Sequence, residues 1–420
     1  MPASLRIAIV SDFEITGGAA IATSRLARGL TERGHRVLRC VANPEPTGAR
    51  SWSRAVVPSV SPRFPALELA SRRLPVVASL ECKRRVRGAG RSLLAILERF
   101  RPDVVNLHNL HGASSWDPSL ASLCARRWPT VWTLHDMWSF TGRCAYACDC
   151  ERYLAGCDAD CPTAHEYPSL PSRRIAPAYR ERRRVLASAP GLVAVAPSRW
   201  LASCARNGLW QKHRVEVIPN GLPVDAFAQT SPQEARARLG LPPEEPVFVV
   251  VCQSCEDRRK GLDLFLSALS HCPLPRVHVL VAGRGSPPRD LPPAVVWHSL
   301  GTVARLERLA EVYSAGDCYV HPARADNFPN VVLEALASGT PVAAFRVGGL
   351  PDAVRPGNTG WLVEPFDVVA LGATLARAFH EGVDLRTRCR QVAAEEYALD
   401  VQAARYEALF RELLSPVRVG

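Results

Sequence analysis

The chain has 420 residues, which is too long for one ordinary hydrophobic core and favours two α/β domains. With 47% hydrophobic and 22% charged residues, its composition is that of a folded globular protein and excludes a disordered or membrane-spanning class. The formal net charge of +12 indicates an anionic partner, such as a nucleic acid, an anionic membrane surface or an anionic substrate.

Short runs of β-branched residues recur along the chain, and each is followed by apolar residues at helical spacing. The predicted strands are residues 7–10, 104–107, 130–134, 192–196, 247–251, 277–282 and 318–321. This alternation predicts parallel sheets, whose ligand-binding loops lie at the carboxyl ends of the strands. The first strand shows no signal-peptide pattern, so we expect a cytoplasmic protein whose fourteen cysteines are mostly reduced.

Two adjacent glycines follow the first strand. Gly17 and Gly18 precede an amphipathic helix, and paired glycines let backbone amides approach a ligand and point a helix N-terminus at negative charge. An ordinary tight turn between strand and helix explains the pair equally well. The segment is neither a GxGxxG fingerprint nor a Walker loop, which disfavours a dinucleotide or ATP cradle.

Basic stretches are concentrated in the first half of the chain. Residues 83–87, 173–174 and 180–184 are rich in arginine and lack interleaved aromatic residues or any nucleic-acid motif. They are explained equally by a solvated helix face and by contact with phospholipid headgroups, and nucleic acid is not an expected partner. Peripheral contact with an anionic membrane, at the inner face of the cell membrane, is therefore an expectation.

Polar side chains end the second and third predicted strands. His108, Asn109 and His111 follow one strand, and His135 follows the next. A single histidine is most often structural, but several polar groups converging at strand ends favour a site where an imidazole hydrogen-bonds a sugar hydroxyl.

In the second half, cations follow the strand at residues 247–251. Arg258, Arg259 and Lys260 lie just beyond that strand and before a predicted helix. Lysine as a point charge and arginine as a bidentate partner suit a diphosphate, whereas a solvated basic loop is the alternative.

The most informative segment is residues 324–336. Pro329 and Asn330 mark a helix start whose free backbone amides suit an anion. Asp326 precedes that start and Glu334 follows it, so the first is placed for hydroxyls of a sugar and the second for those of a ribose. The residues predicted to border the phosphates are Asn327, Phe328, Pro329, Asn330 and Val331. A capped amphipathic helix with an incidental glutamate is the alternative.

A seam between domains is visible where a strand runs into the turn dipeptide Asn220-Gly221. We predict a first domain at residues 1–212 and a second at residues 213–394. Apolar residues at helical spacing in the last segment, residues 395–420, predict a helix that returns towards the first domain.

These residues resemble family 4 glycosyltransferases. The family's Glu-x7-Glu motif is similar to the run from Asp326 to Glu334, and residues 335–342 continue the similarity. The glycine loop at Gly17, residues 218–221, the phosphate-binding lysine at Lys260, and residues 348–352 match as well. Residues 135–162 resemble a branch that includes colanic-acid-type and other bacterial exopolysaccharide transferases.

The resemblance implies an α/β GT-B fold, with two facing Rossmann-like domains of parallel sheets and a cleft between them. It implies a retaining glycosyltransferase that moves a sugar from a nucleotide-diphosphate donor, held by the second domain, to a saccharide or lipid-linked saccharide acceptor, held by the first. His135, Asp326 and Glu334 would be the catalytic residues, with His108 and Asn109 on the acceptor side. The implied same-face route needs no protein nucleophile and no cofactor.

The sequence departs from the family at two positions. The first motif glutamate is Asp326, whose shorter side chain alters its reach towards the donor sugar. Many members carry an arginine five positions before the phosphate lysine, and that position is Cys255, so Arg258 or Arg259 would supply the second cation.

Five cysteines follow His135 within one loop. The related branch carries cysteines similarly placed, which favours Cys144, Cys150, Cys157 and Cys161 as ligands of a structural zinc ion. Free thiols or a local disulfide are the alternatives.

Three other functions are open at this point. A sugar-nucleotide epimerase or phosphorylase would use a similar frame, and a natural-product glycosyltransferase would differ only in its acceptor. The aspartate at position 326 also suits a catalytically silent sugar-nucleotide-binding subunit that partners an active transferase.

Overall fold

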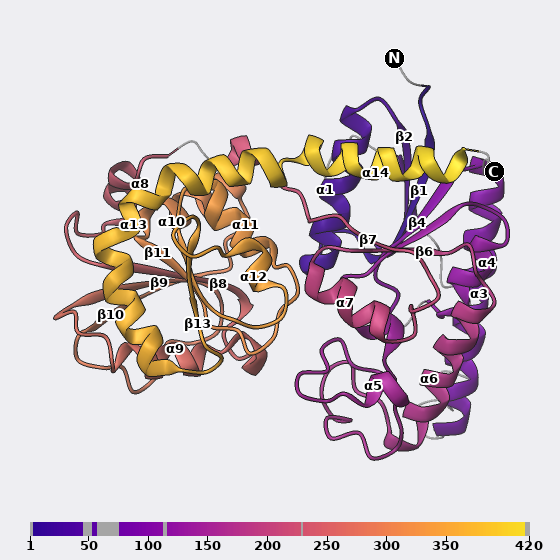
Figure 1. Cartoon of the computed structure of the whole chain (residues 1–420), viewed down its shortest axis with the longest axis horizontal. Helices are drawn as coiled ribbons and strands as arrows, with labels where there is room; N and C mark the ends of the chain where they lie inside the picture. Colours follow the sequence, from indigo (N-terminus) through magenta and orange to yellow (C-terminus); the bar gives the residue numbers. More distant parts are fainter. Residues whose placement is uncertain (1–2, 45–52, 57–74, 112–115, 228–229, 416–420) are drawn as a thin grey trace. The chain divides into compact units, whose positions relative to one another are not determined.

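The computed structural model of the chain describes residues 3–44, 53–56, 75–111, 116–227 and 230–415, without the side chains of residues 53–56 and 75–87. The basic side chains of residues 83–87 therefore lie outside the described residues. The chain divides into two compact units (Figure 1): Met1–Ile218 with Ala403–Gly420, and Pro219–Gln402.

The first unit is built on a parallel sheet whose described strands have the order β3-β2-β1-β4-β5-β6-β7. They are β1 (Arg6–Phe13), β2 (Arg36–Asn43), β3 (Ser53–Val56), β4 (Val104–Leu107), β5 (Thr130–Thr133), β6 (Val193–Ala196) and β7 (Val215–Val217).

Helices cover both faces of this sheet because alternate residues of a strand point to opposite sides. Ile7 and Ile9 of β1 pack with α1 (Gly18–Glu32) and α14 (Leu399–Leu414). Ala8 and Val10 pack with the helices of the other face, which are α3 (Pro75–Phe100), α4 (Ser119–Ala125), α6 (Ser172–Ala187) and α7 (Arg199–Asn207). The short elements η1 (Trp138–Phe140) and α5 (Arg152–Ala155) lie in the segment between β5 and α6.

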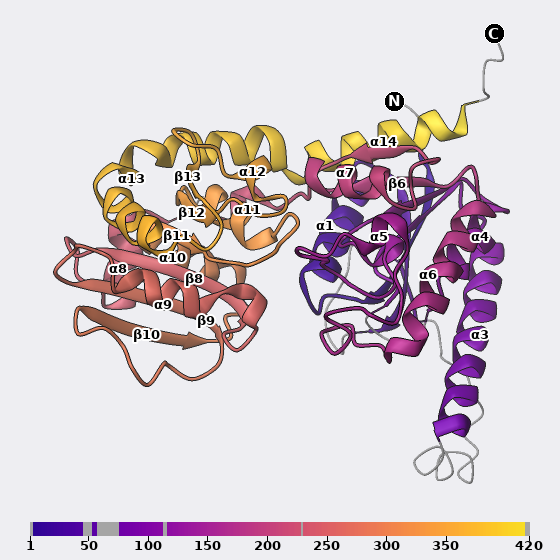
Figure 2. The same cartoon turned by 60° about the horizontal axis from the view of Figure 1, so that its bottom comes forward.

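The second unit repeats this plan with the strand order β10-β9-β8-β11-β12-β13, again parallel throughout (Figure 2). Its strands are β8 (Val247–Ser254), β9 (Val277–Arg284), β10 (Val295–Gly301), β11 (Cys318–His321), β12 (Val342–Phe345) and β13 (Gly360–Val363). Its helices are η2 (Val224–Ala226), α8 (Pro232–Leu239), η3 (Arg258–Lys260), α9 (Leu262–Leu269), α10 (Leu306–Ala315), α11 (Asn330–Ala337), α12 (Leu350–Ala353) and α13 (Val368–Tyr397).

The structure confirms the predicted fold class of α/β units with parallel sheets, and all seven predicted strands are present. The unit boundary differs from the predicted break after residue 212, because β7 pairs with β6 and extends the first unit to Ile218. The second boundary differs as well, because α13 runs past residue 394 and the chain rejoins the first unit at Ala403. No helix among the described residues is long and apolar enough to cross a bilayer.

Candidate functional site

In both sheets, predicted site residues follow the two strands at the same topological position, and His135 follows the next strand of the first sheet, β5. In each strand order the direction of winding reverses once, between β1 and β4 in the first unit and between β8 and β11 in the second. Loops that leave such neighbouring strands diverge, and ligands of doubly wound sheets bind there. Each unit therefore carries a candidate site, and the two are described separately.

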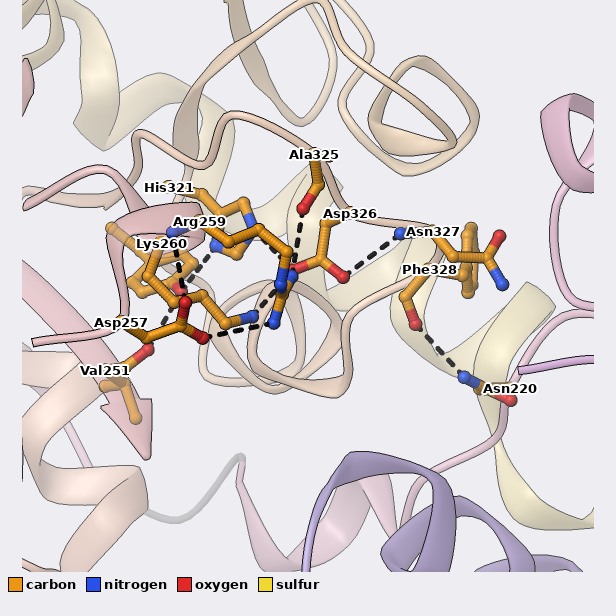
Figure 3. Close-up of polar contacts among 11 residues, drawn as sticks. Asn220, Val251, Asp257, Arg259, Lys260, His321, Ala325, Asp326, Asn327 and Phe328 are labelled. Atoms are coloured by element: carbon orange, nitrogen blue, oxygen red, sulfur yellow. Dashed lines mark hydrogen bonds and ion pairs between the residues drawn. The ribbon is translucent and has the colours of Figure 1, made fainter. Parts of the chain in front are cut away.

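The site of the second unit is centred on the Asp326 carboxylate (Figure 3). Its Oδ2 atom lies 2.7 Å from Lys260 Nζ, 3.2 Å from His321 Nε2 and 3.4 Å from Arg259 Nη1. The Asp326 Oδ1 atom accepts a hydrogen bond of 3.0 Å from the backbone N–H of Asn327. The structure thus brings together both cations after β8 and the aspartate after β11.

Backbone contacts hold the two loops of this site against each other. Arg259 Nη1 donates to the Ala325 carbonyl at 2.9 Å, and the Arg324 N–H donates to the Arg259 carbonyl at 2.8 Å. Gly261 has φ +70°, and a Cβ atom there would lie 1.9 Å from the Pro322 carbonyl oxygen. Only glycine permits this approach, so Gly261 sets the distance between the cations and the β11 loop.

A second glycine encloses Asp326 from the other side. Gly348 has φ +53°, and a Cβ atom there would lie 1.9 Å from the Asp326 carbonyl oxygen. That carbonyl accepts a hydrogen bond of 3.2 Å from the Gly349 N–H. The predicted match at residues 348–352 therefore has a structural reason, which is a turn that packs on the backbone of Asp326.

Charge dominates the ionisation of this cluster. Burial raises the pKa of Asp326, but Lys260 and Arg259 outweigh burial and hold it well below its usual range. Burial lowers the pKa of His321 despite its contact with Asp326. The cluster consists of one carboxylate, two permanent cations and a neutral imidazole, and it presents net positive charge to a ligand.

The helix start beside this cluster is organised as predicted from Pro329. Pro329 caps α11, which begins at Asn330, and Asn220 Nδ2 donates to the Phe328 carbonyl at 3.0 Å. The Val332 N–H donates to the carbonyl of the capping residue Pro329 at 3.1 Å, which tightens the first turn of α11. Asn327, Phe328 and Asn330 are buried, whereas Val331 is half-buried.

Glu334 lies one turn into α11. Its side chain is buried, and its Oε2 atom accepts a hydrogen bond of 3.1 Å from the Tyr313 hydroxyl. Tyr313 thereby orients the carboxylate predicted for ribose hydroxyls.

The position of the second family cation is occupied by a thiol, as the sequence shows. Cys255 Sγ lies 3.7 Å from Cys252 Sγ, and the guanidinium of Arg259 lies beside Asp326. The geometry therefore favours Arg259 over Arg258 as the replacement cation.

In the first unit, a glycine opens α1. Gly17 is the residue before the helix and has φ +89°, a conformation that favours glycine. A Cβ atom there would meet nothing within 4 Å, so the space beside the helix start is open at this residue.

The histidines after β4 and β5 take part in two hydrogen-bonded pairs. His108 Nδ1 lies 2.9 Å from His135 Nε2, and His111 Nε2 lies 2.8 Å from Asp136 Oδ2. Burial lowers the pKa of His135 to about 4, despite the nearby Asp136. Burial also lowers the pKa of His111, but Asp136 outweighs burial and the net shift is upwards. One pair is thus neutral and the other charged.

Asn109 ends the same strand as His108, and the carbonyl of Asn109 accepts a hydrogen bond of 3.1 Å from the Asp12 N–H. This bond ties the loop after β4 to the end of β1, across the point where the strand order reverses.

The cysteine-bearing segment after β5 is held by two buried arginines. Arg143 Nη2 donates to Thr163 Oγ1 at 2.7 Å, and Arg182 Nη1 donates to the carbonyls of Thr141 and Gly142 at 2.9 and 2.7 Å. The predicted zinc ligands Cys144, Cys150, Cys157 and Cys161 are free thiols. Across the described residues, no three histidine, cysteine, aspartate or glutamate side chains are placed to hold a metal ion together.

Two site residues escaped sequence reasoning. His321 closes the predicted strand at residues 318–321, and Asn106 lies inside the strand before His108. The rule of searching the carboxyl ends of strands points to His321. The same rule does not point to Asn106, because this polar residue lies inside a strand and its hydrogen-bond partners are known only from the three-dimensional structure.

Models of known families match both halves of the chain. A model described as Glycosyltransferase Family 4 matches residues 16–226, which is half of the chain, and one described as Glycosyl transferases group 1 matches residues 245–381. A D-inositol 3-phosphate glycosyltransferase of Mycobacterium sp. (strain JLS) is 39% identical over 168 residues. Those residues are 37% of this chain and 37% of the relative, so the match spans little more than a third of either protein.

Solved structures resemble the whole chain. Sucrose-phosphate synthase from Thermosynechococcus elongatus has a TM-score of 0.72 at 20% identity, over 97% of this chain and 99% of that one. HepE of Anabaena, solved in complex with UDP and glucose, has a TM-score of 0.63 at 16% identity, over 97% and 100% of the two chains. At these identities the likeness establishes the fold, which is GT-B.

Proposed function

This chain belongs to glycosyltransferase family 4, and on that basis we propose that it moves a sugar from a nucleotide-diphosphate donor to an acceptor hydroxyl with retention of configuration. The observation that carries the proposal is the cluster of Lys260, Arg259 and Asp326 beside the start of α11. Two cations and the positive end of a helix dipole supply what a diphosphate requires, and the carboxylate supplies what sugar hydroxyls require.

In this proposal the second unit binds the donor. The pyrophosphate interacts with Lys260, Arg259 and the amides at the start of α11, all of which stabilise the negative charge that grows as the leaving group departs. Asp326 balances the cations before the donor arrives, and its carboxylate accepts from hydroxyls of the transferred sugar. Glu334, oriented by Tyr313, accepts from the ribose hydroxyls.

The reaction itself then needs no protein nucleophile and no cofactor. The acceptor hydroxyl attacks from the face that the phosphate leaves, and the departing phosphate takes its proton. The protein contributes binding, orientation and charge stabilisation.

The first unit binds the acceptor, a saccharide or lipid-linked saccharide used in exopolysaccharide, other polysaccharide or glycolipid assembly. Gly17 and Gly18 at the start of α1 suit a phosphate of such a ligand, His108 and Asn109 line the acceptor side, and His135 offers an imidazole to a sugar hydroxyl. We place the protein in the cytoplasm, with peripheral contact at the inner face of the membrane.

A ligand screen tests the donor. We expect one class among UDP-, GDP- and dTDP-sugars to raise the melting temperature, because a ligand that binds only the folded state stabilises it. The shift should disappear in Lys260→Ala and persist in Lys212→Ala, which removes an exposed lysine of the first unit. If no nucleotide sugar raises the melting temperature of the wild type or of Lys212→Ala, the proposal is overturned.

One structural feature favours a second function. The Asp326 Oδ2 atom already contacts three partners, so a donor has to displace ion pairs before this short side chain reaches a sugar. A catalytically silent sugar-nucleotide-binding subunit would bind the donor in the screen but would show neither transfer nor donor hydrolysis. Hydrolysis of the bound donor by the purified chain excludes that function.

We also propose that Cys144, Cys150, Cys157 and Cys161 hold a structural zinc ion, whose binding would have to draw together thiols that are not grouped around one point in this structure. Their support is their position in one segment and the approach of two of them to one hydroxyl, with Cys144 Sγ and Cys161 Sγ at 4.0 and 3.9 Å from Thr163 Oγ1. Elemental analysis of the purified protein should find about one zinc per chain, and Cys161→Ser should lower that content. Metal-free protein of full stability would overturn this proposal.

A further inference from the structure

The two neutral histidines of the first unit belong to a longer chain of buried polar groups. His108 Nδ1 lies 2.9 Å from His135 Nε2, and His108 Nε2 lies 2.9 Å from Asn106 Oδ1. Asn106 Nδ2 lies 3.0 Å from Thr133 Oγ1, which lies 2.9 Å from the hydroxyl of Tyr406 on α14. We call this set, from His135 to Tyr406, the histidine relay. Water does not reach its buried members, so each atom's role as donor or acceptor is set by its neighbours.

The direction of the relay is fixed at Asn106. Its Nδ2 atom lies 3.2 Å from the Val131 carbonyl oxygen, which can only accept a hydrogen bond. The amide nitrogen must therefore face Val131, and the amide oxygen must face His108. Because that oxygen also can only accept, His108 Nε2 carries a proton.

The remaining protons follow from the charge of the two rings. Burial, with help from His135 and Arg39, holds the pKa of His108 well below its usual range, and burial lowers the pKa of His135 to about 4. The charged groups that face His135 oppose each other, since Asp136 favours its protonated form and His111 disfavours it. A neutral imidazole has one N–H, so His108 Nδ1 carries a lone pair and can only accept.

We propose that Asn106 and His108 are positioning residues that hold His135 in its Nε2-protonated tautomer, with Nδ1 as a hydrogen-bond acceptor. His135 Nε2 must donate to the lone pair of His108, which leaves the lone pair of His135 on Nδ1. The backbone carbonyl of Val131 is thus the origin of a preference that is transmitted through two side chains to a residue of the candidate site.

This arrangement defines the chemistry that His135 can recognise, and here the inference rests on the proposed function. A lone pair on Nδ1 attracts a hydroxyl that donates its hydrogen, whereas it repels a phosphate oxygen, which has no hydrogen to give. A neutral ring also cannot protonate a leaving group at neutral pH. The ligand atom at His135 is therefore a sugar hydroxyl acting as donor.

A single substitution should reverse the direction of the hydrogen bond between His108 and His135. Asn106→Asp keeps the shape of the side chain but places a carboxylate beside His108 Nε2, which favours a doubly protonated His108. The imidazolium then donates from Nδ1 to His135 Nε2. His135 must accept at that atom, so its proton moves to Nδ1 and its acceptor becomes a donor.

Nitrogen NMR of histidine-labelled protein at neutral pH tests the inference, because protonated and lone-pair ring nitrogens have well-separated chemical shifts. His108→Gln and His135→Gln assign the two rings by loss of their signals. We expect His135 to be protonated at Nε2 in wild type and at Nδ1 in Asn106→Asp. Asn207→Asp, the same change at an exposed position of the same unit, should leave the wild-type pattern.

The wild-type spectrum alone can overturn the inference, even if Asn106→Asp does not fold. His135 protonated at Nδ1, or at both nitrogens, at neutral pH would contradict the relay. The spectrum needs no substrate, so its result is independent of whether the chain transfers sugars. If the relay is present and transfer is absent, the proposed function fails and the tautomer assignment stands.

Discussion

The two units place predicted site residues at the carboxyl ends of strands in similar sheets, yet Asp326 and His135 differ in their electrostatics. At the reversal of strand order in the second unit, attraction between charges outweighs burial and keeps Asp326 ionised against Lys260. At the end of β5 in the first unit, one strand away from the reversal, burial outweighs the nearby carboxylate and keeps His135 neutral. The strand order therefore determines where a ligand can bind, and the side chains determine whether the ligand is bound by charge or by directed hydrogen bonds.

The difference fits two kinds of ligand group. A diphosphate needs positive charge, which the second unit supplies through Lys260 and Arg259. A hydroxyl needs a donor or acceptor of defined direction, which a neutral histidine supplies. Four changes in the chain would break or sharpen this contrast.

The largest effect is expected from adding a methyl group behind Asp326. Gly348→Ala would place Cβ 1.9 Å from the Asp326 carbonyl oxygen at φ +53°, so the backbone must move. We expect the free energy of unfolding of the second unit to fall by about 4 kcal/mol in urea titrations.

Gly17→Ala and Gly357→Ala are the matched controls for that change. Both glycines have positive φ, +89° and +72°, but a Cβ atom would meet nothing within 4 Å at either position. Each should lose less than Gly348→Ala, about 1–3 kcal/mol, which is the usual cost of a backbone conformation that favours glycine. If all three variants lose the same free energy of unfolding, the packing of the Gly348 turn on Asp326 does not stabilise the second unit.

The next effect concerns binding of a nucleoside diphosphate. Lys260→Ala removes a cation and leaves Asp326 less balanced, so the affinity measured by calorimetry should fall by about 3 kcal/mol, or on the order of 100-fold. His135→Gln should change this affinity little, because a neutral ring offers no charge to phosphate. Equal losses in the two variants would contradict the division of roles between the units.

A pH titration tests the neutral site directly. The pKa of His135 is about 4 in the folded protein and about 6.5 in an unfolded chain, so the unfolded chain binds more protons between these values. Stability must therefore fall as pH is lowered from 6.5 towards 4. His135→Gln should reduce the loss between pH 7 and pH 4.5 by about 2 kcal/mol in urea titrations.

The control for the titration is His165→Gln, which replaces an exposed histidine of the same unit. It should leave the pH dependence of the free energy of unfolding unchanged. A slope that is the same in wild type and in His135→Gln would mean that His135 is not held neutral.

The smallest effect is expected at the surface of the first unit. On α6 the arginines at positions 173, 174, 180, 183 and 184 are exposed, whereas Arg182 is buried with its guanidinium 4.0 Å from the centroid of the Trp138 ring. Each exposed arginine near an anionic membrane contributes about 1 kcal/mol. Reversing two of them, Arg173→Glu with Arg174→Glu, should reduce sedimentation with anionic vesicles at low salt.

Arg305→Glu in the second unit is the matched control, because that side chain is 86% exposed and far along the chain from α6. It should leave sedimentation unchanged. If sedimentation with vesicles changes neither in Arg173→Glu with Arg174→Glu nor with the lipid charge, the membrane contact is excluded.

Sequence reasoning found seven strands as short apolar runs and did not predict others, among them β2 and β12. Residues 7–10 and 247–251 are such runs, whereas β2 contains Arg36 and Arg39 and β12 contains two alanines. Arg39 is fully buried and donates from Nη2 to Ser11 Oγ at 2.9 Å, so a charged residue inside a strand hid that strand from the pattern. Strand propensity is assigned residue by residue, so it does not include the contacts that a side chain makes across the sheet.

The candidate sites show the same limit. Lys260, Asp326 and His135 follow predicted strands, so topology alone was enough to single them out. The contacts that define their behaviour join positions far apart in the chain, such as Lys260 with Asp326 and Thr133 with Tyr406. Which groups are charged, and which way a ring donates, follow from those contacts and required the three-dimensional structure.

The return of the chain to the first unit at Ala403 has a consequence for biosynthesis. A ribosome makes the first sheet before the second unit, but the residues of α14 that cover Ile7 and Ile9, among them Tyr406 and Phe410, emerge after it. The nascent first unit therefore waits with one apolar face uncovered while the whole second unit is translated, a period in which chaperones would be needed most. Recombinant production of the first unit by itself should join residues 403–415 to residue 218 through a short linker.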